Sequence, residues 1–225
     1  MLSAWLAAND EAIKSGRFWK TWFLSFGLLG LAFVINYFAG LYATERASSP
    51  VTDIILSNIR VYDVDGIFAY GAIAFWICIA FVLLADLRLS PFALKSVSLF
   101  TLIRSFFVSL THIGPFQPDF AVRSVQVVNK VTFGGDLFFS GHTGLPFLMA
   151  LVFWENKRLR YFCLASSVFF ATCALLGHFH YSIDVFAAYF MTYSIFHLAR
   201  VAFSSDLRLF KSSPFVAGVD NRSGK

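Results

Sequence analysis

Residues 66–85 read GIFAYGAIAFWICIAFVLLA, a stretch of twenty residues without a charged side chain. A helix rises about 1.5 Å per residue, so this stretch is long enough to cross a hydrocarbon core of about 30 Å. The whole chain agrees with it, because 58% of the 225 residues are hydrophobic and only 14% are charged. The sequence therefore predicts an all-α membrane protein.

Five further apolar runs lie on either side of this stretch, at about residues 21–43, 92–113, 137–154, 160–177 and 182–203. Together they predict six transmembrane helices in one membrane domain, residues 19–203. Residues 1–18 place apolar side chains among polar ones, so we expect an amphipathic segment on the membrane surface. Residues 204–225 are rich in serine and charge, and we expect a disordered cytoplasmic tail.

The basic residues set the orientation of the six helices. With both termini in the cytoplasm, thirteen Lys and Arg lie on the cytoplasmic side, and only Arg46, Arg60, Arg123 and Lys130 lie on the other. The positive-inside rule therefore predicts cytoplasmic termini. The formal net charge of +5 fits these loops better than nucleic-acid binding, for which no motif is present. The three cysteines show neither a disulfide framework nor a zinc spacing.

Polar residues that could carry chemistry concentrate in two stretches: residues 134–144 read GGDLFFSGHTG, and residues 178–185 read HFHYSIDV. In the predicted topology both lie on the non-cytoplasmic side, and two intervening helices return the chain to the same face. His180 and Asp184 are four residues apart, so on a helix they share one face. The carboxylate could then fix the tautomer of the imidazole and support positive charge on it.

A third candidate is Arg104, which lies inside the apolar run at 92–113. A charge at that depth costs several kcal/mol, so such a residue usually faces a polar cavity and has a partner. Phosphate suits the fork of a guanidinium group, and a carboxylate partner or an extended side chain that reaches the interface are the alternatives.

The motifs Gly135-Asp136-x-x-x-Ser140-Gly141-His142-Thr143 and His180-Tyr181-Ser182-x-Asp184-Val185 resemble the two catalytic motifs of the sphingomyelin synthases and their relatives. That family is a branch of the type-2 phosphatidic acid phosphatase superfamily. Pro50-x-x-Asp53 resembles its first motif, and Arg104 with Thr111 and Pro115 resembles another. Lipid phosphatases of the superfamily carry an arginine six residues before the second histidine, where this chain has Ala174, which favours the sphingomyelin-synthase branch.

The resemblance implies roles for the residues that match. His180 would attack phosphorus, oriented by Asp184, and His142 would protonate the leaving alkoxide and later activate the acceptor hydroxyl. Asp136 would assist His142 or bind the headgroup. The implied contacts to phosphate or substrate are those of Asp136, Ser140, Gly141, Thr143, Arg104 and Tyr181, although Ser140 and Thr143 could equally be helix caps.

The expected function is transfer of a phospho-headgroup from a glycerophospholipid to a lipid hydroxyl such as that of ceramide, without a metal or cofactor. Hydrolysis with water as the acceptor uses the same residues and stays open, as does a membrane transporter or scaffold without chemistry. We expect a multi-pass protein of a bacterial inner membrane, with its site on the periplasmic or lumenal side. The headgroup, the acceptor and the oligomeric state stay open.

Overall fold

The computed structural model describes residues 2–116 and 137–217, and within these ranges its regular secondary structure is helical, without a strand. The described helices are α1 (Leu2–Lys14), α2 (Gly16–Glu45), α3 (Asp65–Ala85), α4 (Ser90–Leu110), α6 (Gly141–Val152), α7 (Lys157–Leu176), α8 (Ser182–Ala202), α9 (Ser204–Lys211) and α10 (Pro214–Ala217), with the 3-10 turns η1 (Leu56–Asn58) and η2 (Leu87–Leu89). The predicted all-α class is confirmed.

Five helices, α2, α3, α7, α8 and α4 with the turn before it, are long and apolar enough to cross a membrane. Their lateral surfaces carry exposed hydrophobic side chains, among them Phe38, Phe81 and Phe190. Contact between water and an apolar surface of that extent is unfavourable, whereas contact with lipid chains is not. The five apolar helices therefore indicate an integral membrane protein.

The fourth predicted span is shorter than the sequence suggested. The apolar run at 137–154 contains α6, which has twelve residues and is about 18 Å long. Ser140 caps its start, and the chain turns after Val152. The structure thus supports five spanning helices, and a sixth crossing by this segment stays a prediction.

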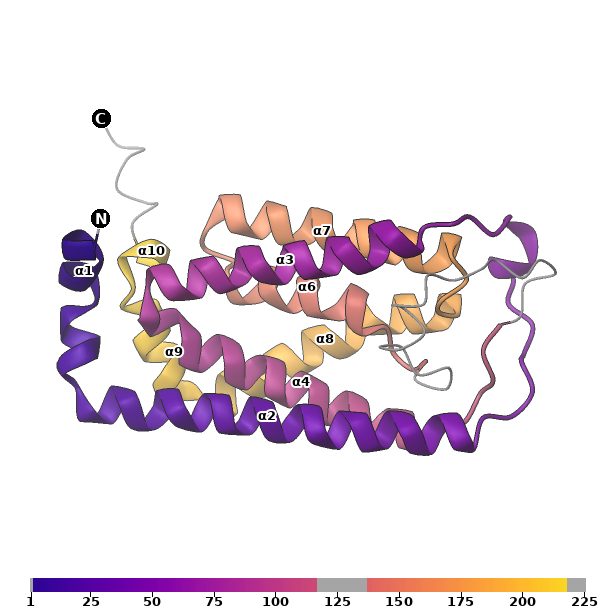
Figure 1. The fold of residues 1–225 in the computed structure, drawn as a ribbon, viewed down its shortest axis with the longest axis horizontal. Helices are drawn as coiled ribbons and strands as arrows, with labels where there is room; N and C mark the ends of the chain where they lie inside the picture. The colour runs from indigo at the N-terminus through magenta and orange to yellow at the C-terminus, as the bar shows by residue number, and fades with distance from the viewer. Residues whose placement is uncertain (1, 117–136, 218–225) are drawn as a thin grey trace.

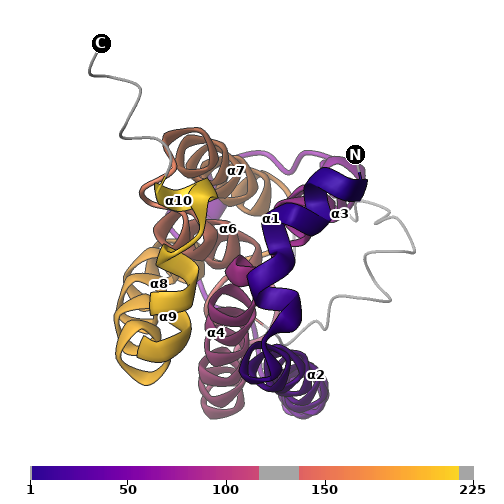
Figure 2. The ribbon, with the colours of Figure 1, turned by 90° about the vertical axis from the view of Figure 1, so that its left-hand side faces the viewer.

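Helix α4 is the most buried of the five apolar helices, and it packs against α2, α6 and α8. Figure 2 shows it between α2 and α8, with α6 beside it, while α3 and α7 lie on the opposite side of α6. Gly144 lets α6 approach closely, because a Cβ atom there would lie 2.7 Å from the ring of Phe100 and 2.8 Å from Thr192 Oγ1. These contacts fix the start of α6 against α4 and α8.

The long helices run side by side, so the molecule has two ends (Figure 1). We call the end that holds α1, α9 and α10 the terminal end, and the end where α6 and α8 begin the motif end. The first and last described helices lie at the same end of the molecule (Figure 1). The cytoplasmic location of that end remains a prediction from the basic residues.

The N-terminal segment is a helix, as its amphipathic pattern predicted. Trp5 Nε1 donates to the carbonyl of Leu84 at 2.7 Å, and Asn9 Nδ2 donates to that of Ala85 at 3.3 Å. In return, Asn9 Oδ1 accepts from the N–H of Leu87 at 2.8 Å. Helix α1 therefore satisfies carbonyl groups that the last turn of α3 leaves without a partner.

The expectation of a disordered tail is wrong for residues 204–217, which form α9 and α10. Phe210 is 2% exposed and packs against the rings of Phe92 and Phe153. Asp206, four residues earlier and so on the same face, pairs with Lys95 at 2.7 Å. Composition alone predicted disorder, but one buried aromatic ring and one buried ion pair order the segment.

Candidate active site

The start of α6 is held by its own hydroxyl groups. Ser140 is the N-cap, and its Oγ accepts from the N–H of Thr143 at 3.4 Å and from Thr143 Oγ1 at 3.2 Å. The N–H of Ser140 donates to the carbonyl of Asp184 at 3.1 Å. Both hydroxyl side chains are fully buried. Of the two roles that the sequence left open for them, the geometry shows capping. The backbone bond from Ser140 to Asp184 joins the first turns of α6 and α8.

Asp184 lies in the first turn of α8, where its Oδ2 accepts from the N–H of Tyr181 at 3.0 Å. The same oxygen is 3.7 Å from His180 Nδ1, which is an ion-pair distance and too long for a hydrogen bond. His180 Nδ1 instead lies 2.9 Å from the backbone carbonyl of Leu137. The carboxylate therefore lies beside the ring as expected, but the hydrogen bond that orients the ring comes from Leu137.

This contact defines the chemistry of the His180 ring. A carbonyl oxygen can only accept, so Nδ1 must carry the proton. In the neutral ring Nε2 then holds a lone pair, which a nucleophile needs. Both His180 and Asp184 are more than nine-tenths buried.

His142 is the second residue of α6, and its ring is half-buried against the ring of Phe68, with 4.3 Å between the centroids. It lies close enough to His180 and to Arg104 for a positive charge on either group to disfavour one on the His142 ring. The structure thus brings together the two histidines that the sequence separated by 38 residues. A phosphate group between them would remove that repulsion.

Arg104 is 7% exposed, and its Nε donates to the carbonyl of Phe139 at 2.7 Å. Its guanidinium lies beside Gly141, because a Cβ on Gly141 would be 3.5 Å from Nε. The buried arginine predicted from the apolar run is therefore at the start of α6, next to His142.

Tyr181 does not offer a free hydroxyl group. Its OH donates to the carbonyl of Gly114 at 2.7 Å and accepts from the N–H of Val51 at 3.2 Å, so it braces two loops. Burial raises the pKa of this phenol. Asp136, the other carboxylate of the predicted site, lies outside the described residues.

Asp53 makes more hydrogen bonds than its place in the motif Pro50-x-x-Asp53 suggested. Its Oδ2 accepts from the N–H and the hydroxyl of Ser182, at 2.7 and 2.8 Å, and its Oδ1 accepts from the N–H groups of Ile55 and Leu56. Burial alone would raise the pKa of this carboxyl, but these hydrogen bonds together lower it. Asp53 therefore ties the loop after α2 to the start of α8, two residues from His180.

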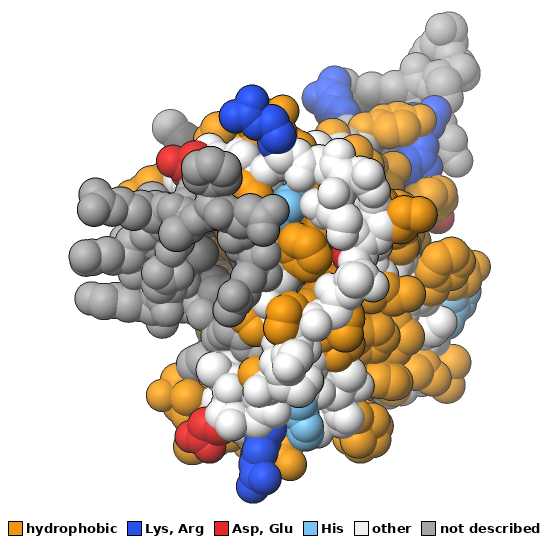
Figure 3. All heavy atoms as spheres, turned by 90° about the vertical axis from the view of Figure 1, so that its right-hand side faces the viewer, with side chains coloured by type: hydrophobic (Ala, Val, Ile, Leu, Met, Phe, Trp, Pro, Cys, Tyr) orange, Lys and Arg blue, Asp and Glu red, His pale blue; other side chains and the backbone are white. Residues whose placement is uncertain are grey.

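His178 lies two positions before His180 and has contacts of its own. It has a positive φ of 54°, packs edge-on against Phe116 and has no hydrogen-bond partner for either ring nitrogen among the described residues. Burial lowers its pKa. Figure 3 shows this end of the molecule, where histidine side chains reach the surface between hydrophobic and uncharged atoms.

Two contributors to the site were not predicted from the sequence as site residues. Asp53 carried a signal, the Pro50-x-x-Asp53 spacing. The carbonyl of Leu137 carried none, because any residue type supplies the same group. Within residues 2–116 and 137–217, no three His, Cys, Asp or Glu side chains gather as metal ligands.

Residues 134–201 match the family model described as PAP2 superfamily C-terminal, a range that contains both histidines and Asp184. The match supports the type-2 phosphatidic acid phosphatase superfamily, whose members are generally membrane phosphatases or phosphotransferases. No curated protein and no solved structure matches the chain significantly.

Proposed function

We propose that this protein is a membrane lipid phosphotransferase that moves a phospho-headgroup from a glycerophospholipid to a lipid hydroxyl through a phosphohistidine. The observation that carries the proposal is the hydrogen bond between His180 Nδ1 and the Leu137 carbonyl. It leaves Nε2 as the nucleophile, and His142 lies within electrostatic range of both His180 and Arg104. The family match at residues 134–201 supports the same class of reaction.

In the first step, His180 Nε2 forms a bond to phosphorus, and the bond from phosphorus to the glycerol oxygen breaks. The leaving oxygen takes a proton from His142, so diacylglycerol departs as a neutral alcohol. The phosphorylated imidazole keeps its proton on Nδ1 and carries a positive charge. Asp184, 3.7 Å away, stabilises that charge.

In the second step, the acceptor hydroxyl gives its proton to His142 and forms a bond to phosphorus. The bond from phosphorus to Nε2 breaks, which returns His180 to its neutral form. Arg104 stabilises the negative charge that builds on the phosphate oxygens in both steps. The remaining contacts proposed for the headgroup are Asp136 and the N–H groups near Gly141, at the start of α6.

The basic residues support an active site on the non-cytoplasmic side, because the motif end lies opposite the end that holds most of the Lys and Arg. We propose six crossings, with the segment of α6 as the fourth, and a bacterial inner membrane as the location. Ceramide is the acceptor that the resemblance to sphingomyelin synthases implies.

Hydrolysis is the second candidate, because the matched superfamily includes phosphatases. Purified protein in nanodiscs is given headgroup-labelled phospholipid with and without ceramide. Transfer predicts a labelled lipid product that requires ceramide, whereas hydrolysis predicts soluble labelled headgroup phosphate under both conditions. If the protein is a transporter or a scaffold, neither product should form.

The nucleophile is tested with His180→Ala, and the exposed His197→Ala is the matched control. We expect His180→Ala to abolish turnover and to lose an acid-labile headgroup adduct that wild type and His197→Ala form. Turnover that survives in His180→Ala would contradict the assignment. Substrates with better leaving groups should partly rescue His142→Ala, because its acid role is then less needed.

A further inference from the structure

A cleft of about 580 Å³ opens at the terminal end, away from the histidines. The start of α2, the turn η2 and helix α9 form its wall. The polar side chains that line it are those of Ser15, Arg17, Thr21, Arg88, Ser205, Asp206, Arg208 and Ser212. The guanidinium groups of Arg17, Arg88 and Arg208 bring charged donors to one cleft, and an anion with several oxygens can accept from them together.

Two acidic residues adjoin the cleft, and each already has a cationic partner. Asp86 accepts from Arg88 Nε at 2.9 Å and from Arg88 Nη2 at 3.1 Å. Asp206 accepts from Lys95 Nζ at 2.7 Å. Arg17 and Arg208 are exposed and contact no carboxylate in the part of the chain that the structure describes. The cleft therefore carries an excess of positive charge.

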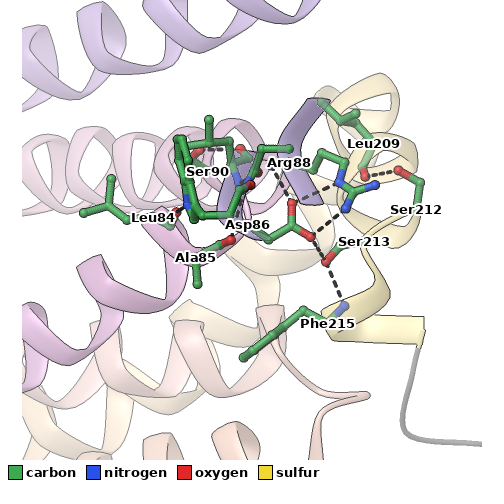
Figure 4. Close-up of polar contacts among 12 residues, drawn as sticks. Leu84, Ala85, Asp86, Arg88, Ser90, Leu209, Ser212, Ser213 and Phe215 are labelled. Atoms are coloured by element: carbon green, nitrogen blue, oxygen red, sulfur yellow. Dashed lines mark hydrogen bonds and ion pairs between the residues drawn. The ribbon is translucent and has the colours of Figure 1, made fainter. Parts of the chain in front are cut away.

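Buried polar contacts hold its walls in place. Thr21 Oγ1 donates to Asp206 Oδ1 and accepts from Lys95 Nζ, both at 2.7 Å, which ties α2, α4 and α9 together. Ser213 Oγ donates to Asp86 Oδ2, which ties the segment after α9 to η2 (Figure 4). The cleft is thus shaped before a ligand arrives, which reduces the entropic cost of binding.

We propose that this cleft binds a phosphate-bearing ligand. Phosphate offers the oxygens that arginine forks recognise, and the volume leaves room for a group attached to it. Two sources share this chemistry: the headgroup of an anionic phospholipid in the adjacent leaflet, and free phosphate. The inference does not depend on the reaction at the histidines.

The test measures binding by the full-length protein in detergent with native mass spectrometry. The probes are dioleoyl-phosphatidylglycerol, dioleoyl-phosphatidylcholine and inorganic phosphate. The variant Arg17→Gln/Arg208→Gln removes the two arginines that have no acidic partner. The control Lys20→Gln/Lys211→Gln removes the same charge from exposed positions of α2 and α9 that do not line the cleft.

We expect the arginine variant to weaken phosphatidylglycerol binding roughly tenfold or more, because it loses charge-assisted hydrogen bonds. The lysine control should stay within about twofold, and phosphatidylcholine should bind weakly to all three proteins. Competition by millimolar inorganic phosphate would identify free phosphate as a source, and lack of competition would identify the lipid.

Equal weakening by the two variants, or no weakening by either, would overturn the proposal, because binding would then reflect surface charge alone. Thermal unfolding checks that the variants fold. Where the double variant does not fold, Arg17→Lys/Arg208→Lys keeps both charges and loses both forks. It should still weaken binding several-fold, and unchanged binding would contradict the proposal.

Discussion

The geometry around His180 makes a specific prediction for Asp184→Asn. The substitution removes the negative charge that lies 3.7 Å from Nδ1, while an amide oxygen can still accept from the N–H of Tyr181. The start of α8 should therefore survive. The tautomer should also survive, because the carbonyl of Leu137 continues to accept the Nδ1 proton.

The expected loss follows from the charge. Unit charges 3.7 Å apart at an effective dielectric of about 20 attract by about 4.5 kcal/mol. The carboxylate also serves the N–H of Tyr181, so we expect it to contribute about 3–4 kcal/mol to the cationic phosphohistidine. Each 1.36 kcal/mol is a factor of about ten, so kcat should fall by about 10²–10³.

The assay is headgroup release from labelled phospholipid in nanodiscs, measured with thermal unfolding for the same preparations. Asp63→Asn removes an exposed carboxylate at the same end of the molecule and is the control. Activity within twofold of wild type would refute a role for the charge. A folded variant as inactive as His180→Ala would show that Asp184, and not Leu137, holds the tautomer.

Three further predictions concern stability and are read from thermal unfolding. Asp206→Asn leaves Lys95 buried without its charge partner, so we expect a loss of about 3–5 kcal/mol, and an unchanged midpoint would show that water already reaches the pair. Gly144→Ala places a Cβ 2.7 Å from an aromatic carbon of α4 and should cost about 1–3 kcal/mol, whereas Gly30→Ala, with nothing within 4 Å, should not destabilise. The lowered pKa of Asp53 gives stability that is present above about pH 4 and is lost as pH falls through the folded-state pKa, so wild type should lose more stability between about pH 5 and pH 3 than Asp53→Asn. Parallel losses in both proteins would contradict this last prediction.

The spans could be predicted because the period and length of apolar runs are properties of the sequence. The run at 66–85 became α3 at 65–85, and Pro91 lies in the first turn of α4, as a helix start requires. The run at 137–154 did not predict where α6 begins and ends, because hydropathy does not detect that Ser140 caps a helix. The expectation of disorder for the tail was wrong because it used average composition, on which a few buried side chains have no effect.

The candidate site could be predicted to the level of side chains and no further. Both histidines, Asp184 and Arg104 were predicted as site residues from the family resemblance, the four-residue spacing and the depth of Arg104, and the fold brings them to the same end. The group that orients His180 is a backbone carbonyl, and backbone groups are the same at every position. Only the path of the chain between Leu137 and the start of α8 places that oxygen 2.9 Å from Nδ1.

Helix α4 links the two ends of the bundle through two buried cations. It carries Lys95 near the terminal end and Arg104 near the motif end, both buried. Lys95 lies within the helix and binds Asp206 of α9. Each cation needs a polar partner from another element, since a buried charge without one is costly. The partners, Asp206 for Lys95 and the Phe139 carbonyl for Arg104, are what fix α9 and the start of α6 against the same helix.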